Sequence, residues 1–383
     1  MGILKGYERP TYLSHPLAIN GFVHWLRLLR TCGGVDAKHL VHAACITAAS
    51  PLTAHVRLCE RLVYALRRRS VAITKPPVFI IGHWRTGTTH LHNLMSQDPA
   101  LGFVSTFQAM APTSFLVGRP VLRPIMAFFL PSVRPVDDMP MSVDLPQEEE
   151  FALCNACPHS YYVGLYFPTR ARALFQKCAL LEGISDKALA QWRKAYIDVV
   201  TKATLHARGK RLVLKNPVNT ARTAAIRTVF PGAKFIHIYR NPYEVFGSSI
   251  RLGQAFREWM ALQAISDAEI EANVLALYRD MMMRFFEQKG SIPKGDLVEV
   301  RFEDLDARPM DELARIYETL GLPGWSEARE PIEQCLAAHA QYRKHPFSMS
   351  AREIAKVEAH WQFAIDALGY ERPGPQSERS MMS

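Results

Sequence analysis

The sequence of 383 residues lacks any apolar run of the roughly 20 residues that a membrane-spanning helix needs. Its most apolar stretch, residues 125–130, is short and lies between Pro124 and Pro131. We therefore expect a protein that is soluble or peripheral to a membrane, without a transmembrane helix.

Cysteine is also scarce, with seven residues scattered along the chain. An odd number at this low density does not suit a disulfide framework, so we expect reduced thiols and a cytoplasmic location. The one CxxC pattern, Cys154 to Cys157, has no second ligand pair at the spacing of a zinc site. We interpret it as two small residues on a buried helix and expect no metal site.

Acidic residues are fewer than basic ones, 36 against 46, which gives a formal net charge of +10. This surplus favours anionic partners: nucleic acid, a membrane surface, or small molecules that carry phosphate or sulfate. Apolar residues make up 48% and charged residues 21%, values that exclude disorder as the dominant state.

Short apolar runs typical of buried parallel strands occur at four places, and helical stretches separate them. The strands are predicted at 78–81, 212–214, 235–239 and 297–300. The clearest helices are predicted at 185–208 and 265–289. This alternation predicts an α/β fold with one parallel sheet and helices on both faces.

Residues 16–70 are predicted to form helices with apolar stripes and interspersed arginines. Arg67, Arg68 and Arg69 follow the last of these stripes. A basic amphipathic region of this kind could lie on an anionic membrane. Because such helices usually bury their stripe, we favour a helical layer packed on the main domain with its arginines in solvent. We predict a helical extension over 1–75, a main domain over 76–370 and a polar tail over 371–383.

The segment 82–90 reads Gly-His-Trp-Arg-Thr-Gly-Thr-Thr-His and connects a predicted buried strand to a helix. Glycines let a backbone turn tightly and present its N–H groups, which bind an anion together with the helix N-terminus. Strand, loop and helix coincide, so the context predicts a phosphate-binding loop.

Gly82 and Gly87 have the spacing of the nucleotide-triphosphatase loop, but Thr88 stands where that loop carries lysine, and the cation is Arg85. No apolar strand ends in an aspartate suited to magnesium. These departures argue against a nucleotide kinase or NTPase. A non-enzymatic phosphate- or nucleotide-binding module is the other alternative. The cations lie at strand ends rather than along one face, so we expect no nucleic-acid partner.

Arg240 follows the predicted strand 235–239, at the edge where open α/β sheets bind ligands. Pro242 suits the first turn of a helix, on which Ser248 lies two turns further along. An arginine fork together with a hydroxyl can hold a terminal phosphate.

These segments resemble the superfamily of sulfotransferases that use 3′-phosphoadenosine 5′-phosphosulfate (PAPS). Residues 85–89 resemble its 5′-phosphosulfate loop, and Arg240 with Ser248 resembles its 3′-phosphate element. Weaker similarities are 301–305, which matches a Tyr-Glu-Asp-Leu segment with Phe302 in place of tyrosine, and the basic cluster 342–345. The resemblance covers about 76–370, and the N-terminal helices with the acidic run 147–150 are typical of a bacterial-type branch.

The resemblance implies a single P-loop-like sulfotransferase domain that transfers a sulfuryl group from PAPS to a hydroxyl or amine and releases PAP. No metal is expected as a cofactor. By the same resemblance, the donor is expected to bind Arg85, Thr86, Gly87, Thr88, Thr89, His90, Arg240 and Ser248.

Lys215 ends a predicted strand and is expected to contact the sulfuryl and leaving-group oxygens. Where cytosolic relatives carry a histidine base, this chain has Pro217. The general base must therefore lie elsewhere, and we consider Glu148 first, Glu150 second and His90 third. The alternative for the glutamates is an acidic helix N-terminus stabilised by the helix dipole.

Residues 103–135 and 139–170 fit no strand pattern and are rich in phenylalanine, methionine and proline. We expect them to form the acceptor pocket, which suits an apolar or lipid-like acceptor. The basic N-terminal helices would allow peripheral contact with the inner face of the membrane.

Overall fold

A computed structural model describes residues 15–68, 73, 75–133, 139–338 and 349–373. The sheet within this part of the chain has five strands in the order β2-β3-β1-β4-β5, and all neighbours are parallel. The strands are β1 (Val78–Ile81), β2 (Leu101–Gly102), β3 (Arg211–Lys215), β4 (Lys234–Tyr239) and β5 (Leu297–Arg301). The four predicted strands are confirmed. The sequence did not reveal β2, because two residues at a sheet edge form no apolar run.

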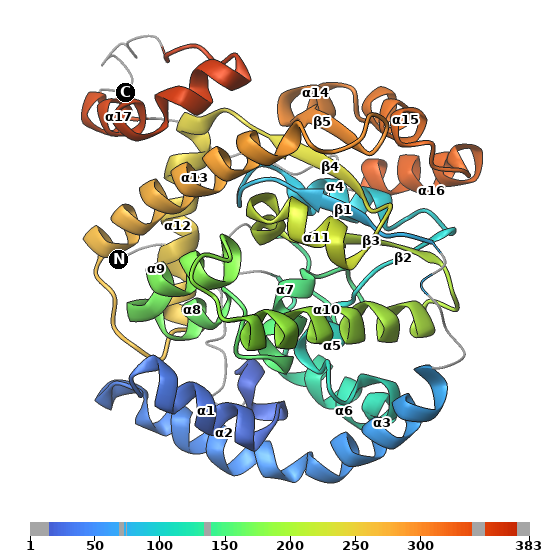
Figure 1. Cartoon of the computed structure of the whole chain (residues 1–383), viewed down its shortest axis with the longest axis vertical. Helices are drawn as coiled ribbons and strands as arrows, with labels where there is room; N and C mark the ends of the chain where they lie inside the picture. Colours follow the sequence, from blue (N-terminus) through green and yellow to red (C-terminus); the bar gives the residue numbers. More distant parts are fainter. Residues whose placement is uncertain (1–14, 69–72, 74, 134–138, 339–348, 374–383) are drawn as a thin grey trace.

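Helices surround the sheet on both sides (Figure 1). The first group is α1 (Phe22–Cys32), α2 (Leu40–Leu52), α3 (Ala54–Arg67), α4 (Thr88–Met95), α5 (Thr106–Met110), α6 (Phe115–Phe129), α7 (Glu149–Ala156) and α8 (Val163–Tyr166). The second group is α9 (Ala171–Leu174), α10 (Asp186–His206), α11 (Thr223–Val229), α12 (Pro242–Trp259) and α13 (Asp267–Lys289). The third group is α14 (Phe302–Ala307), α15 (Pro309–Leu320), α16 (Trp325–Ala338) and α17 (Ala351–Leu368).

Alternate residues of the central strand β1 face two separate cores. Phe79 and Ile81 belong to a core shared with α7, α10, α13 and α17. Val78 and Ile80 belong to a core shared with α4, α15 and α16. Since side chains of a strand alternate between faces, four consecutive apolar residues are the pattern that a strand buried on both sides requires.

Local capping explains where the two predicted long helices begin. The Ser185 side chain accepts a hydrogen bond from the Ala188 N–H (3.3 Å) at the start of α10. Ser266 and Glu269 form a reciprocal capping box at the start of α13. The predicted ranges 185–208 and 265–289 are confirmed to within two residues at each end.

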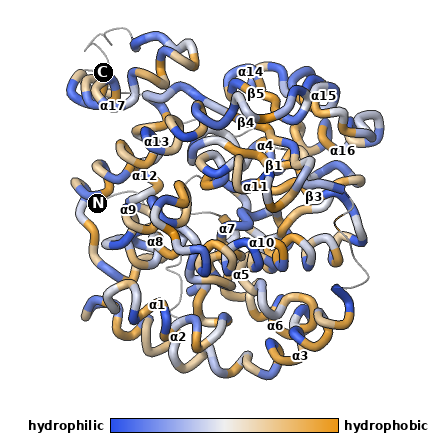
Figure 2. Tube along the Cα trace, in the orientation of Figure 1, coloured by the Kyte–Doolittle hydropathy of each residue, from blue (hydrophilic) through white to orange (hydrophobic). Residues whose placement is uncertain are grey.

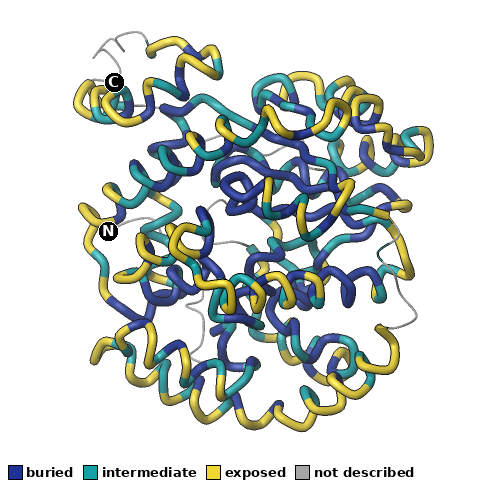
Figure 3. The backbone as a smooth tube through the Cα atoms, viewed as in Figure 1, coloured by how far each residue is buried: buried dark blue, intermediate teal, exposed yellow. Residues whose placement is uncertain are grey.

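The helices α1, α2, α3 and α6 form a layer along one side of the molecule, at the bottom of Figure 1. The predicted packing on the main domain fails for most of the apolar stripe of Leu58, Leu62, Val63 and Leu66, because the exposed fractions of the three leucines are 58%, 61% and 79%. Figure 3 shows the exposed outer side of α2 and α3. In the described ranges, no helix is long and apolar enough to cross a membrane.

The inner side of α3 is held by a buried ion pair. Glu60, which is 1% exposed, accepts hydrogen bonds from Lys202 Nζ of α10 (2.8 Å) and from the Val117 N–H of α6 (2.9 Å). Lys202 Nζ also donates to the Pro112 carbonyl (3.0 Å). One carboxylate therefore joins α3, α6 and α10.

We predict that Lys202→Met lowers the free energy of unfolding by about 3–5 kcal/mol, because it leaves the Glu60 carboxylate buried without a partner. Urea titration followed by circular dichroism measures this loss. The double variant Glu60→Gln/Lys202→Met removes both charges and keeps an oxygen for the Val117 N–H, so it should recover most of the loss. A double variant no more stable than Lys202→Met would contradict this account.

Candidate active site

The loop after β1 has the backbone of an anion-binding turn. Gly82, Arg85 and Gly87 have positive φ angles of 141°, 72° and 95°, and Gly87 is the N-cap of α4. A Cβ atom on Gly87 would overlap the Phe302 ring, and one on Gly82 would overlap the Ile238 carbonyl. Only glycine fits either position, so the tight turn predicted from the sequence has a steric cause.

Hydrogen bonds inside the loop hold this conformation. The Thr86 hydroxyl donates to the His83 carbonyl (2.8 Å), and the Gly82 N–H donates to Thr220 Oγ1 (2.7 Å). Thr86 and Thr88 are buried, and Thr89 and His90 are partly exposed on the first turn of α4. Thr86 therefore braces the loop with its side chain, which leaves backbone N–H groups for a ligand.

Arginine side chains converge beside the loop. Arg85 Nε donates to Ser248 Oγ (2.8 Å), which joins the two predicted nucleotide elements. Arg240 forms an ion pair with Glu244 and lies over the Phe302 ring at 4.6 Å. Burial, followed by the charges of Arg85 and Arg240, lowers the pKa of the Arg251 guanidinium. The charges of Arg85 and Arg240 thus act on Arg251, and a cluster of three cations makes a site for an anion.

Arg251 was not identified from the sequence. It follows Ser248 by three positions and lies on the adjacent turn of α12. That helical spacing is the signal that could have revealed it. The late basic cluster 342–345 lies outside the described residues.

Glu148 and Lys215 form an ion pair at the carboxyl end of β3. Lys215 is the last residue of β3, and Glu148 is the N-cap of α7. The second oxygen of Glu148 accepts a hydrogen bond from the Tyr162 hydroxyl, which in turn accepts one from Trp84 Nε1 (2.9 Å). Burial, together with the Glu148 charge, holds the pKa of Tyr162 well above its ordinary value. A chain of hydrogen bonds thus connects Lys215 and Glu148 to the phosphate loop.

The next two glutamates point into the protein. Glu150 is fully buried, pairs with Arg222 and accepts hydrogen bonds from Asn216 (2.7 Å) and Ser160 (2.7 Å). This position does not fit the hypothesis that Glu150 is an alternative base, because no acceptor can reach it. The sequence did not show which of Glu148 and Glu150 faces the loop.

The histidine at the start of the loop is neutral. Burial lowers the pKa of His83 to about 4, and its Nδ1 is 2.9 Å from the Trp84 carbonyl. His90, the third candidate base, is the third residue of α4. It is partly exposed on the first turn of that helix, directly after the loop.

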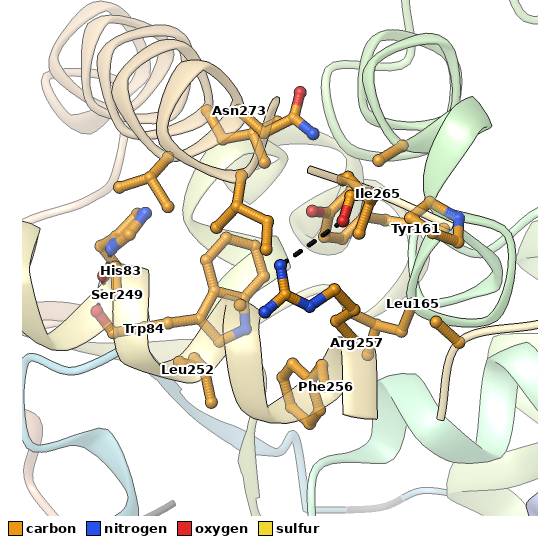
Figure 4. A pocket seen from close by; sticks show the side chains of 18 residues that line it. His83, Trp84, Tyr161, Leu165, Ser249, Leu252, Phe256, Arg257, Ile265 and Asn273 are labelled. Atoms are coloured by element: carbon orange, nitrogen blue, oxygen red, sulfur yellow. Dashed lines mark hydrogen bonds between the residues drawn. The ribbon is translucent and has the colours of Figure 1, made fainter. Parts of the chain in front are cut away.

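An apolar pocket opens next to the loop (Figure 4). Trp84 lies among its lining residues, and α8, α12 and α13 supply most of the others, including Leu165, Leu252 and Val274. Arg257 is the only Lys, Arg, Asp or Glu in the lining of this pocket, and it pairs with Asp267 (2.8 Å). The lining is therefore apolar apart from a neutralised arginine and a few polar groups.

The predicted acceptor segments correspond only partly to this pocket. Tyr161, Leu165 and Pro168 come from the segment 139–170, but the described part of the segment 103–135, residues 103–133, contributes no lining residue. Phe107 and Phe115 are instead buried in a small core with α6. The sequence could not indicate the contribution of α12 and α13, because their pocket residues follow the same helical pattern as core residues.

The whole chain was compared with known proteins. The model of the Sulfotransferase family matches residues 76–327. The omega-hydroxy-beta-dihydromenaquinone-9 sulfotransferases Stf3 of Mycobacterium bovis and Mycobacterium tuberculosis are each 32% identical over 359 residues, which cover 94% of this chain and 92% of theirs.

Among solved structures, the sulfotransferase STF9 of Mycobacterium avium superposes with a TM-score of 0.65 at 19% identity, over 93% of this chain and 98% of that one. The sulfotransferase STF1 of Mycobacterium tuberculosis gives 0.62 at 20% identity, over 88% and 90%. These likenesses concern the fold, whereas the family match and the 32% identical relatives concern ancestry. The chain therefore belongs to the sulfotransferase family, in its bacterial-type branch, and is a sulfotransferase.

Proposed function

We propose that the protein transfers a sulfuryl group from PAPS to the hydroxyl of an apolar, lipid-like acceptor. The observation that carries this proposal is the ion pair of Glu148 and Lys215, which a hydrogen-bond chain connects to the phosphate loop and to the wall of an apolar pocket. A base, a cation, an anion site and an apolar cavity are the four parts that such a transfer needs.

The residues around the loop fit the donor. The loop between Gly82 and Thr88 offers backbone N–H groups at a helix N-terminus for the phosphosulfate. Arg240, with Ser248, would hold the 3′-phosphate. Arg251 adds a third cation next to Arg240 and Arg85. Arg240 Nε is buried and has no hydrogen-bond partner among the described residues. An unsatisfied arginine N–H beside other cations supports a phosphate ligand.

PAPS supplies an activated sulfuryl group whose bond to the phosphate oxygen breaks as the new S–O bond forms. Glu148 accepts the proton that the acceptor hydroxyl loses, and Tyr162 fixes the orientation of that carboxylate. Lys215 lies beside Glu148 at the end of β3, where its charge neutralises the oxygens that gain negative charge. We assign His83 no part in the proton transfer. Burial lowers its pKa to about 4, so its imidazole stays neutral.

The pocket and the relatives both support the proposed acceptor class. The pocket between α8, α12 and α13 holds apolar side chains and no exposed acid among its lining residues. Two relatives that are 32% identical over 94% of this chain are named for a hydroxylated menaquinone derivative. Both observations favour an alcohol attached to an apolar body over a sugar, whose many hydroxyls an apolar wall cannot satisfy.

We predict that PAP binds the purified protein and that Arg240→Ala weakens this binding by about 10–100-fold, as expected for one lost charge-assisted contact. Arg251→Ala should weaken PAP binding less, since we expect Arg251 to attract the phosphate by its charge without a direct hydrogen bond. Isothermal calorimetry measures both. The matched control is Arg315→Ala on α15, an exposed arginine paired with Glu312. Equal binding of PAP by all four proteins would overturn the assignment of Arg240 to the donor site, and no binding of PAP or tighter binding of ATP would remove PAPS as the donor.

We predict that Glu148→Gln lowers kcat by about 10²–10⁴-fold, because an amide cannot accept the acceptor proton. PAP affinity should stay within about twofold, which separates a catalytic defect from a binding defect. Glu358→Gln on α17 is the matched control, since that carboxylate contacts Tyr243 and Arg372. Transfer of labelled sulfate measures the rate. A Glu148→Gln enzyme as fast as the control would assign the base to another residue.

We predict that Leu252→Asn lowers kcat/KM for a long-chain alcohol by about tenfold, because it replaces an apolar side chain of the pocket wall with a polar one of similar shape. The same variant should bind PAP normally and should treat a short water-soluble alcohol like the parent. Steady-state assays with both alcohols separate the effects. If the parent prefers short sugars to amphiphilic alcohols, the lipid-like acceptor is wrong, whereas the PAPS site is unaffected.

A further inference from the structure

Exposed large apolar side chains are concentrated on one side of the molecule. Of the twelve in the described residues, ten lie on α1, α2, α3 and α6, and only Ile197 and Met283 lie elsewhere. The ten are Val23, Leu40, Val41, Leu52, Leu58, Leu62, Leu66, Val121, Ile125 and Phe128. Scattered exposed leucines are ordinary, but such a concentration marks an interaction surface.

The side chains follow helical stripes that point outward. Leu58, Leu62 and Leu66 are four positions apart on α3, and Val121, Ile125 and Phe128 form a similar stripe on α6, which packs against α3. Phe128 is 82% exposed. In Figure 2, apolar residues alternate with polar ones along these helices at the bottom of the view. We call the exposed stripes of α2, α3 and α6 the outer face.

The charges on the outer face have one sign. The only acidic residue on α2, α3 and α6 is Glu60, and it is buried against Lys202. Arg61 is exposed in the middle of α3, Arg67 and Arg68 are exposed at its end, and Arg119 is exposed on α6. Asp144, next to α6, pairs with Arg123. An apolar surface bordered by arginines, without an exposed carboxylate on its helices, is complementary to an anionic lipid bilayer.

We propose that the outer face docks the protein on an anionic bilayer, with the leucine and phenylalanine side chains in the headgroup region and the arginines on the lipid phosphates. A second copy of the chain fits this face less well. A symmetric contact would bring the Arg61 and Arg68 rows of both copies together without a carboxylate to pair with them. The surface would therefore repel itself but attract an anionic membrane.

The layer also touches the candidate acceptor pocket. Ala261 and Ile265 line the pocket, and between them Gln263 donates to the carbonyls of Cys32 and Gly34 (both 2.9 Å) at the end of α1. This loop connects the pocket wall to α1, which packs against α2 in the helix layer that carries the outer face. If the acceptor is lipid-like, a point that rests on the proposed function, docking brings the pocket to the phase in which the acceptor resides.

The test is vesicle flotation with the purified full chain. Vesicles of equal parts phosphatidylcholine and phosphatidylglycerol should bind the protein, vesicles of phosphatidylcholine alone should bind it much less, and binding should fall as salt rises from about 50 to about 500 mM. Leu58→Ser/Leu62→Ser/Leu66→Ser should weaken binding by more than about tenfold. Arg61→Gln/Arg68→Gln should abolish the preference for the anionic vesicles.

The matched control is Ile197→Ser/Met283→Ser, which replaces the exposed apolar residues that lie outside the face and should bind vesicles like the parent. Calorimetry with PAP tests whether each variant is folded and keeps its donor site. Loss of vesicle binding with normal PAP binding is therefore distinct from a failure of the proposed function. Equal vesicle binding by parent and triple variant would overturn the proposal. A parent that dimerises in analytical ultracentrifugation, and a triple variant that does not, would assign the face to a second copy instead.

Discussion

The geometry of the candidate site depends on the buried ion pair between Glu150 and Arg222. Both side chains are fully buried, so only their neighbours compensate the charges: Asn216 donates to Glu150, and Arg222 donates to the Cys178 carbonyl (2.7 Å). Because Asn216 follows Lys215 directly and Glu150 lies in the first turn of α7, this cluster fixes the start of α7 against the end of β3. Glu148 is thereby placed opposite Lys215. A buried pair of this kind adds little net stability, and its role here is position.

Three consecutive glutamates therefore have three environments. Glu148 faces the loop. Glu149 accepts hydrogen bonds from Tyr196 (2.6 Å) and Asn219 (3.1 Å), and burial raises its pKa to about 7. The sequence could predict the tight turn after β1 and the strand-to-helix position of Arg240, because glycine spacing and strand-to-helix context are local. It could not predict that Arg222 neutralises Glu150, since 72 positions separate them and only the tertiary fold brings them together.

The amphipathic N-terminal helices show a different limit of sequence reasoning. Helical periodicity reveals that a helix has two unlike sides, but not which side faces the protein. The general tendency to bury the apolar side gave the wrong orientation for α3, because Lys202 compensates the charge of Glu60 on the opposite side. The buried carboxylate of Glu60 lies on one side of α3, and the three leucines lie exposed on the other. The strands carried no such ambiguity, since β1 is apolar on both faces.

Trp84 separates two kinds of environment in the finished site. On one side are the cations Arg85, Arg240 and Arg251, which suit a multiply charged donor. On the other is a pocket in which the single charged group, Arg257, is already paired. The Trp84 ring lines the pocket, and its indole N–H donates to the Tyr162 hydroxyl. Tyr162 is therefore the one side chain between the apolar wall and the Glu148 carboxylate in this hydrogen-bond chain. In the proposed function, such a boundary would keep an apolar acceptor apart from the donor's charges, which is the condition that sulfuryl transfer to a lipid-like alcohol would impose.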